Sequence, residues 1–385
     1  MNPLFARRAA AIEPFLAMEV LERAQELERA GACIVHLGVG EPDAAAPPEA
    51  LAACTRALAD GETRYTDSRG LLELREAIAA DKAARAGVPV DPRHVLVTSG
   101  TSPAMLLVFG ALVEPGDEVL IPTPHYPCYP NFVRFCGGTP VFVPTDAANG
   151  WQLDVDAVRR ARTPRTRALV FGSPANPTGA IQEAATLRGL ADLDVPLVAD
   201  EIYDGLLFDD ARAPSALAGC ERAWVLDGFS KRYAMTGFRL GYAIAPDAAS
   251  LRTLQVMQQS LFISASHFAQ RAGIAALRHG EPTRQAMVAA YQRRRGLLVD
   301  GLRKLGFAVP APPRGAFYVF ADARAFGADS RRLAFDLLER AHVAVTPGVD
   351  FGAAGEGWLR FTLSAPDAQI EEALARIGRV LARGL

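Results

Sequence analysis

Short apolar runs and longer amphipathic segments alternate along the first two thirds of the chain. Residues 16–30 and 70–85 carry apolar side chains three and four positions apart, which predicts helices with one buried face. Further helical segments are expected at 103–113 and 183–191. Between the helical segments, short runs rich in leucine and β-branched residues predict strands buried on both faces. These runs are 94–98, 118–121, 140–143, 167–171, 195–199, 223–227 and 240–244. The alternation predicts an α/β fold with a mostly parallel, seven-stranded sheet covered by helices.

The last third of the chain follows a different pattern. A long helical stretch from about 249 to 303 precedes a group of shorter elements. Strands are expected near 306–309, 316–320 and 358–363, a helix at 330–341 and a final helix from 367. This mixture predicts a smaller α+β domain. We expect residues 46–285 to form the large domain, and residues 1–45 with 286–385 to form the small one.

Composition narrows the class of protein. Half of the 385 residues are hydrophobic and 22% are charged, as in globular proteins. The 41 basic and 43 acidic residues give a net charge of −2, which argues against a nucleic-acid or membrane-surface role. The charge-free run 95–113 is interrupted by Thr-Ser-Gly-Thr-Ser-Pro, and Glu13 and Pro14 interrupt the apolar N-terminus. None of the five cysteines forms a C-x-x-C pair, so neither a disulfide framework nor a metal site is expected. We therefore predict a soluble, cytoplasmic protein.

Lysine is rare among the basic residues. Lys82, Lys231 and Lys304 are the three lysines, and the other 38 basic residues are arginines. Lys82 and Lys304 lie near predicted helix ends and are expected to be solvated. Lys231 instead follows the predicted strand 223–227 and the turn Gly228-Phe229-Ser230. Because lysine can lose its proton and form a Schiff base, which arginine cannot do usefully, this position is a candidate for covalent chemistry.

Polar residues follow most of the predicted strands. Ligands of an open parallel sheet bind outside the carboxyl ends of its strands, so these residues are expected at one rim. They are Ser99-Gly100-Thr101, His125-Tyr126, Ser173 through Gly179, Asp200 through Tyr203, and Ser230-Lys231.

Each of these features has an ordinary structural explanation when it is taken alone. Ser99 and Thr101 open a helix and could be caps, whereas the functional reading is a phosphate held by the helix N-terminus. The string from Asn176 to Gly179 could be a simple turn. Asp200 could pair with an arginine or cap a helix, because a lone buried charge is costly. The ordered set is harder to explain in this way than any single member.

The combined motifs resemble the fold-type I pyridoxal-phosphate enzymes, in the class I and II aminotransferase group that includes aspartate aminotransferase. The matching strings occur in the family's order and span nearly the whole chain. They are Leu37 through Asp43, Tyr65 through Gly70, Ser99 through Thr101, Ser173 through Gly179, Asp200 through Tyr203, Ser230-Lys231, Arg239 through Gly241, and Arg360.

The resemblance implies a role for each matched residue around the cofactor. Lys231 would form a Schiff base with pyridoxal 5'-phosphate and shuttle a proton during catalysis. Asp200 would keep the pyridine nitrogen protonated, which makes the ring an electron sink. Asn176 and Tyr203 would bind the ring's 3' oxygen, and Tyr126 would stack on the ring. The phosphate would be held by Ser99, Gly100, Thr101, Ser230 and Arg239.

The resemblance also implies substrate and partner contacts. Arg360 would bind the substrate α-carboxylate as a bidentate fork, with Asn176 and Gly40 beside the substrate. Tyr65 would reach the phosphate of a neighbouring subunit, which implies a homodimer with shared active sites. The chain departs from the family at Gly228, where relatives often have a serine that contacts the phosphate, and it has Tyr126 where some relatives have tryptophan.

We therefore expect an aminotransferase that moves an amino group between an L-α-amino acid and a 2-oxo acid by a ping-pong mechanism. A C–S lyase, another β-elimination enzyme or an aminocyclopropane-carboxylate-type enzyme would use the same motifs. A non-catalytic binding protein on this scaffold is disfavoured by the joint presence of Lys231, Asp200 and Arg360. A dinucleotide-dependent oxidoreductase is disfavoured because no G-x-G-x-x-G follows the first strands. The substrate side chain stays open, with Phe15, Ile34 and Phe262 as possible lining residues.

Overall fold

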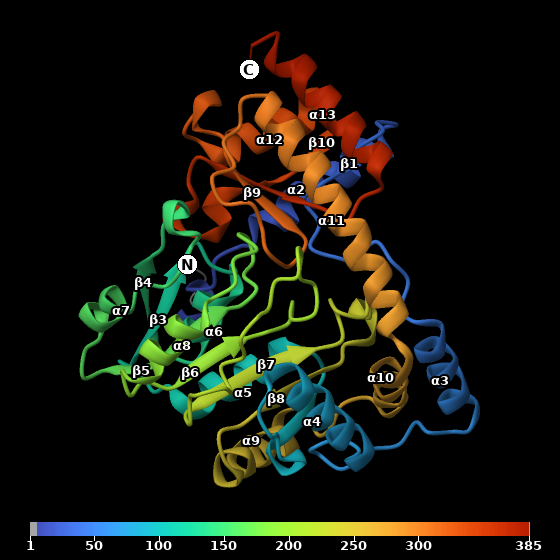
Figure 1. Ribbon diagram of the computed structural model, residues 1–385, viewed down its shortest axis with the longest axis vertical. Helices are drawn as coiled ribbons and strands as arrows, with labels where there is room; N and C mark the ends of the chain where they lie inside the picture. Colours follow the sequence, from blue (N-terminus) through green and yellow to red (C-terminus); the bar gives the residue numbers. More distant parts are fainter. Residues whose placement is uncertain (1–5, 385) are drawn as a thin grey trace.

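A seven-stranded sheet forms the centre of the larger part of the molecule (Figure 1). The computed structural model describes residues 6–384. Along the sheet, β8 is antiparallel to both of its neighbours and the other pairs are parallel. The strand order is β2 (Val95–Thr98), β8 (Gly241–Ile244), β7 (Ala223–Gly228), β6 (Leu197–Asp200), β5 (Thr166–Gly172), β3 (Glu118–Thr123) and β4 (Thr139–Pro144). The predicted α/β class and all seven predicted strands are confirmed.

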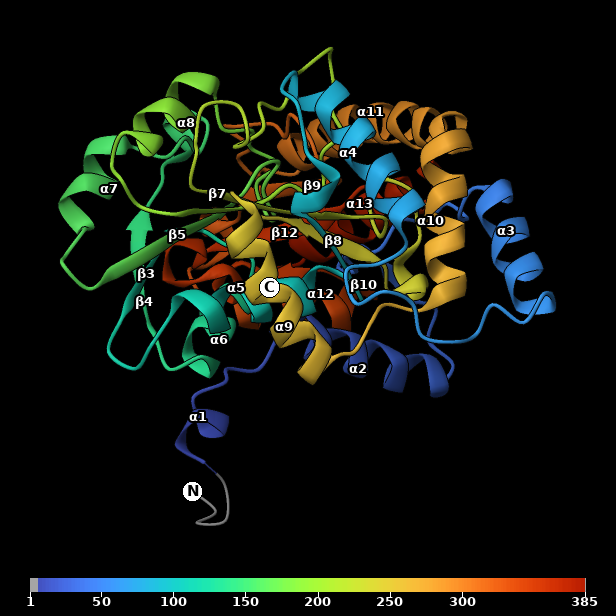
Figure 2. The same ribbon diagram turned by 90° about the horizontal axis from the view of Figure 1, so that it is seen from below.

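Helices cover both faces of this sheet (Figure 2). Successive residues of a strand point to opposite faces, so Leu169 and Phe171 of β5 enter one core while Ala168 and Val170 enter the other. The first core also receives side chains from α4 (Leu72–Ala86), α7 (Val155–Ala161), α8 (Ala184–Ala191) and α10 (His267–His279). The second receives them from α5 (Thr101–Leu112), α6 (Cys128–Phe135) and α9 (Ala248–Leu261). α3 (Pro48–Ala59) packs against α10.

The remaining elements build a third core above the sheet (Figure 1). An antiparallel sheet joins β11 (Thr346–Pro347), β12 (Trp358–Thr362) and β9 (Tyr318–Asp322). It packs with α11 (Glu281–Lys304), α12 (Ser330–Ala341) and α13 (Asp367–Leu381). β1 (Val35–His36) pairs in parallel with β10 (Val343–Ala344), and α2 (Leu16–Arg29) contacts α12. The N-terminal segment thus packs with the C-terminal one, and the division into two domains stays a prediction.

Shorter helices complete the described chain. They are α1 (Arg7–Ala10), η1 (Pro92–His94), η2 (Ala147–Asn149), η3 (Thr236–Phe238), η4 (Arg324–Phe326), η5 (Gly348–Phe351) and η6 (Ala353–Gly355). The charge-free run 95–113 forms β2, a turn and α5, as its sequence predicts. Within residues 6–384, no helix has both the length and the apolar character needed to cross a membrane.

Two predicted elements of the last third are wrong. The stretch 249–303 is three helices, α9, α10 and α11, because Ile263 adopts a positive φ of 66° and Pro282 lacks the N–H that a continuous helix would need. The expected strand at 306–309 is only an isolated bridge between Ala308 and Asp322. Prolines follow directly, at 310, 312 and 313, and cannot donate ladder hydrogen bonds.

The expectation that Lys82 is solvated is also wrong, whereas Lys304 is exposed as expected. Lys82 is fully buried where α4 packs on the sheet. Its Nζ lies 3.2 Å from Asp204 Oδ2 and 3.3 Å from Asp227 Oδ2, and it also pairs with Glu201. Three carboxylates compensate the buried charge, which a lone lysine in that position could not sustain. The partners lie more than a hundred residues away in sequence, so local pattern did not reveal them.

Candidate active site

A cavity of about 440 Å³ lies at the carboxyl ends of the strands, within the size range of small-ligand sites. The sheet rim contributes one side of its lining, and residues 15–21, β9 and β12 contribute the other. Most of the residues singled out from the sequence meet here. They are Gly40, Thr101, Tyr126, Asn176, Asp200, Tyr203, Ser230, Lys231, Arg239 and Arg360.

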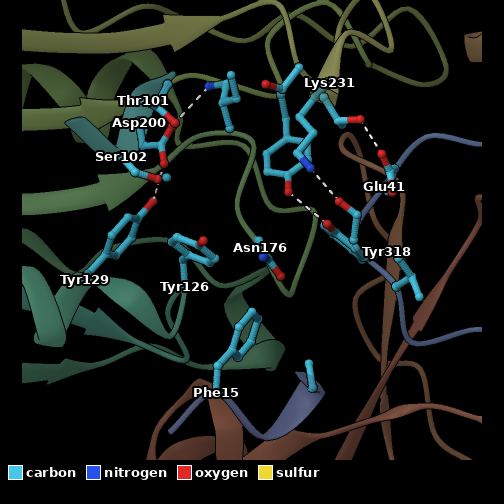
Figure 3. Close-up of a pocket in the computed structure, with 18 of the residues that line it drawn as sticks. Phe15, Glu41, Thr101, Ser102, Tyr126, Tyr129, Asn176, Asp200, Lys231 and Tyr318 are labelled. Atoms are coloured by element: carbon cyan, nitrogen blue, oxygen red, sulfur yellow. Dashed lines mark hydrogen bonds between the residues drawn. The ribbon is translucent and has the colours of Figure 1, made fainter. Parts of the chain in front are cut away.

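Lys231 brings a buried amine into the cavity (Figure 3). It lies three residues beyond the end of β7, and its Nζ donates a hydrogen bond to the carbonyl of Gly40. Burial lowers the pKa of Lys231 to about 8, partly opposed by the carboxylate of Glu41. A lysine with this pKa holds a useful fraction of neutral, nucleophilic amine near pH 7.

Asp200 brings a buried carboxylate into the same cavity. It is the last residue of β6, the strand next to β7. Its partners in the described chain are the hydroxyl of Tyr129 at 2.9 Å and the backbone N–H of Ile202 at 3.2 Å, neither of which is charged. Burial raises the pKa of Asp200 to about 6. A cationic group placed beside Asp200 would stabilise its ionised form.

The N-terminus of α5 and the guanidinium of Arg239 together offer a candidate anion site at the rim. Gly100 precedes α5 with a φ of 97°, and a Cβ there would lie 2.6 Å from Nη2 of Arg239. Glycine therefore lets the guanidinium lie against the start of the helix. The hydroxyl-bearing residues Thr101 and Ser230 also line the cavity. Helix N–H groups, hydroxyls and a guanidinium together suit a phosphate.

The departure at Gly228 has a steric reason. A Cβ on Gly228 would lie 3.0 Å from both Gly241 Cα and the carbonyl oxygen of Leu240 on the neighbouring strand. A serine would require these strands to separate slightly. Ser99 and Gly100 do not themselves line the cavity, although Gly100 shapes it through Arg239.

Arg360 supplies a second, separate cationic point. It is only 2% exposed, and its Nη1 donates to Asn176 Oδ1 at 3.0 Å. Its Nη2 donates to the carbonyl of Gly38 at 2.6 Å, and its guanidinium lies 4.3 Å from the ring centroid of Tyr318. Its Nη2 also donates to Thr346 Oγ1 at 3.1 Å, so its hydrogen-bond partners are all uncharged, and its Nε has no hydrogen-bond partner. A buried guanidinium with spare capacity is suited to a carboxylate.

Two further tyrosines belong to the site and were not predicted. The hydroxyls of Tyr318 and Tyr203 share a hydrogen bond of 2.9 Å, and a Cβ on Gly40 would lie 2.7 Å from Oη of Tyr318. The hydroxyl of Tyr129 donates a hydrogen bond to the Asp200 carboxylate. Tyr129 lies three residues after Tyr126, a helical spacing that could have pointed to it, whereas Tyr318 comes from β9 and had no local signal.

The other predicted lining and partner residues fall in different places. Phe15 lines the cavity and contacts Tyr126 edge to face, with ring centroids 6.4 Å apart. Ile34 packs in a small core with α2 and α12, and Phe262 packs against the α5 face of the sheet. Neither lines the cavity. Tyr65 is 80% exposed and also lies outside the cavity.

Comparison with known proteins agrees with this geometry. Residues 33–377 match the family model for aminotransferase class I and II. The chain is 40% identical to aspartate/prephenate aminotransferase of Thermus thermophilus, over 98% of this chain and 99% of that protein. It is 38% identical to valine–pyruvate aminotransferase of Mycobacterium tuberculosis, over 96% of each chain.

Solved structures give the same result. The aspartate aminotransferase of Thermus thermophilus with maleate superposes with a TM-score of 0.93 at 39% identity, covering 97% of this chain and 99% of that one. An aminotransferase from Mycobacterium tuberculosis superposes with a TM-score of 0.94 at 36% identity, covering 99% and 100%. The relatives do not favour the lyase alternative, since they are named as aminotransferases. The chain belongs to the class I and II aminotransferase family and is an aminotransferase.

Proposed function

We propose that this aminotransferase uses pyridoxal 5'-phosphate, attached through Lys231, to carry an amino group from an L-α-amino acid to a 2-oxo acid in two half-reactions. The observation that carries the proposal is the convergence of Lys231, Asp200 and the anion site of Arg239 in one cavity. When bound, the cofactor supplies an aldehyde that accepts the amino group and a protonated ring that withdraws electrons from the substrate.

The residues present fit this cofactor at each of its functional groups. The phosphate of the cofactor would be held at the start of α5 by Gly100, Thr101, Ser230 and Arg239, together with the preceding residue Ser99. The raised pKa of Asp200 and its uncharged partners fit a cationic ring nitrogen beside it.

The ring itself would lie among three further side chains. Tyr126 would stack on the ring, while Asn176 and Tyr203 would bind its 3' oxygen. All three side chains line the cavity, as do Asp200 and Arg360.

The chain's own side chains would bind the substrate and move its proton. Arg360 would hold the α-carboxylate as a bidentate fork, and Asn176 would hold the guanidinium in place through its 3.0 Å hydrogen bond. Lys231 Nζ would take the proton from the substrate Cα, a task suited to an amine whose pKa is near the working pH. Gly40 would leave room for the substrate beside Tyr318.

We further propose a homodimer in the cytoplasm, with Tyr65 serving the neighbouring subunit's site. Tyr65 is 80% exposed and does not line the cavity of its own chain, which fits a contact with the neighbouring subunit. The five cysteines are free in the structure, as in a reducing compartment. Mixing Lys231→Ala and Tyr65→Ala protomers tests the shared site, because a mixed dimer would contain one intact site. Activity that does not rise on mixing would contradict it.

Single-turnover spectroscopy tests the amino transfer itself. Protein loaded with the cofactor should change its visible spectrum with an amino acid and recover it with a 2-oxo acid. Lys231→Ala should lose this exchange, whereas Lys304→Ala, at an exposed position outside the cavity, should keep it. Release of ammonia and pyruvate without an oxo-acid acceptor would instead indicate elimination and refute the assignment.

A further inference from the structure

The charged side chains around the cavity are few and have assigned partners. Among the described residues that line it, Lys231, Arg239 and Arg360 are positive, and Asp200 and Glu41 are negative. In the proposed function the three cations serve the aldehyde, the phosphate and the α-carboxylate. Within the lining that one described chain contributes, no cation is left for a second carboxylate on the substrate.

Glu41 is the second acidic residue of the lining and supplies no counter-ion for a carboxylate. It lines the cavity near Lys231, whose pKa it raises, and it accepts a hydrogen bond from the hydroxyl of Thr236. Glu41 is exposed and adds a negative charge at the Lys231 end of the cavity. A carboxylate on the substrate side chain would therefore gain no counter-ion from it.

The cavity has an apolar wall away from the charged groups. Phe15, Met18 and Leu21 lie on successive turns at the start of α2 and face it, and Met105 of α5 and Phe132 of α6 join them. Figure 3 shows Phe15 at the opposite end of the cavity from Lys231 and Asp200, with Tyr126 between them. Since the cofactor would occupy the Lys231 and Asp200 end, the Phe15 end is left for the substrate side chain.

The position of this wall is fixed by a contact from the other end of the chain. Asp350, which is 9% exposed, accepts hydrogen bonds from the backbone N–H of Leu16 at 2.8 Å and of Ala17 at 3.2 Å. The first turn of α2 is thereby held against the cavity. Phe15, Met18 and Leu21 lie before residue 33, where the match to the family model begins.

We propose that the substrate side chain is uncharged and apolar, aliphatic or aromatic, and that Phe15, Met18 and Leu21 recognise it. This inference rests on the proposed function, because it assigns Arg239 and Arg360 to the cofactor phosphate and the α-carboxylate. Apolar side chains gain by leaving water for such a wall, whereas a carboxylate loses its hydration without a counter-ion.

A donor series on the cofactor-loaded protein tests the substrate class. The rate of cofactor conversion divided by the donor dissociation constant is measured in single turnovers for leucine, methionine, phenylalanine, aspartate and glutamate. The best apolar donor should exceed both acidic donors at least tenfold. Aspartate or glutamate equal to or faster than the apolar donors would overturn the substrate class alone. No spectral change with any donor would overturn the proposed function, and the substrate class with it.

Equilibrium binding gives a readout that does not depend on turnover. The unreactive monocarboxylates 4-methylpentanoate and 3-phenylpropionate should bind the loaded protein at least tenfold more tightly than maleate, measured by calorimetry. Tighter binding of maleate would overturn the proposal.

Variants of α2 test the recognising residues. Met18→Lys places a cation in the wall, and Gln25→Lys is the matched control, an exposed position of the same helix outside the cavity. The ratio of glutamate to leucine reactivity should rise at least tenfold in Met18→Lys and change less than twofold in Gln25→Lys. Phe15→Ala should lower phenylalanine reactivity at least tenfold relative to alanine reactivity. Ratios within twofold of the wild type in both Met18→Lys and Phe15→Ala would overturn the role of the wall.

Discussion

Replacing Lys82 with methionine removes a buried charge at nearly constant volume. The side chain is fully buried, and its ammonium contacts the carboxylates of Glu201, Asp204 and Asp227. Burial alone would lower the pKa of Lys82, and Arg85 would lower it further, but the three carboxylates outweigh both and the pKa is raised. The cation is therefore held charged by its partners.

The expected cost follows from what the substitution leaves behind. Arg85 still pairs with Asp204 and Asp227, so the loss falls mainly on Glu201, which keeps hydrogen bonds from Ser215 and the backbone of Ala216. Removing one member of a buried ion pair costs about 3–5 kcal/mol of unfolding free energy. Methionine fills most of the vacated space, so little of this cost comes from a cavity.

Urea unfolding at fixed protein concentration measures the effect. Lys304→Met is the matched control, since the same change at an exposed position should stay within about 0.5 kcal/mol of the wild type. Burial already raises the pKa of Glu201, so protonation at low pH should neutralise the carboxylate that lost its partner. The deficit of Lys82→Met should therefore shrink as the pH falls from 7 towards 5. Equal stability of the two methionine variants at pH 7 would refute the reasoning.

Three further outcomes follow from the site and its surroundings. Burial lowers the pKa of His125 to about 4, so the unfolded state binds the proton at a higher pH than the folded state does. About 3 kcal/mol of unfolding free energy should therefore be lost as the pH falls from 6.5 to 4. Unfolding measured across this pH range should show a smaller loss in His125→Gln, and an equal loss would contradict this account. Gly100→Ala, whose Cβ would displace Arg239, should weaken cofactor binding at least tenfold in an absorbance titration, and unchanged affinity would exclude the proposed phosphate site. Arg360→Lys should raise the substrate KM on the order of 100-fold with a smaller change in kcat, because lysine cannot form the bidentate fork, and steady-state kinetics with an unchanged KM would exclude that role.

The sequence predicted what depends on local pattern and chain order. The strands are short apolar runs, and the polar residues that follow them meet at one rim because parallel strands share an edge. This pattern predicts that Asp200 and Lys231 lie close together, and both line the cavity. The same pattern distinguishes Lys231 from the other lysines.

Contacts between residues far apart in the chain could not be predicted from local sequence patterns. Lys82 has the local surroundings of a surface helix residue, and only the fold, which brings it next to Glu201 and to Asp227 of β7, reveals its partners. Lys82 and Lys304 look equally replaceable by arginine in the sequence, but Lys82 is fully buried, where a larger guanidinium would crowd its neighbours. Tyr318 likewise reaches the cavity from β9, a strand of the third core.

The central claim is that Lys231 is the amine that binds the cofactor aldehyde. Borohydride reduction of the cofactor-loaded protein fixes that link, and peptide mapping by mass spectrometry then locates it among the three lysines. We predict one phosphopyridoxyl group per chain, on the peptide that contains Lys231. A stoichiometric adduct on the peptide of Lys82 or Lys304, or no adduct at all, would contradict the account.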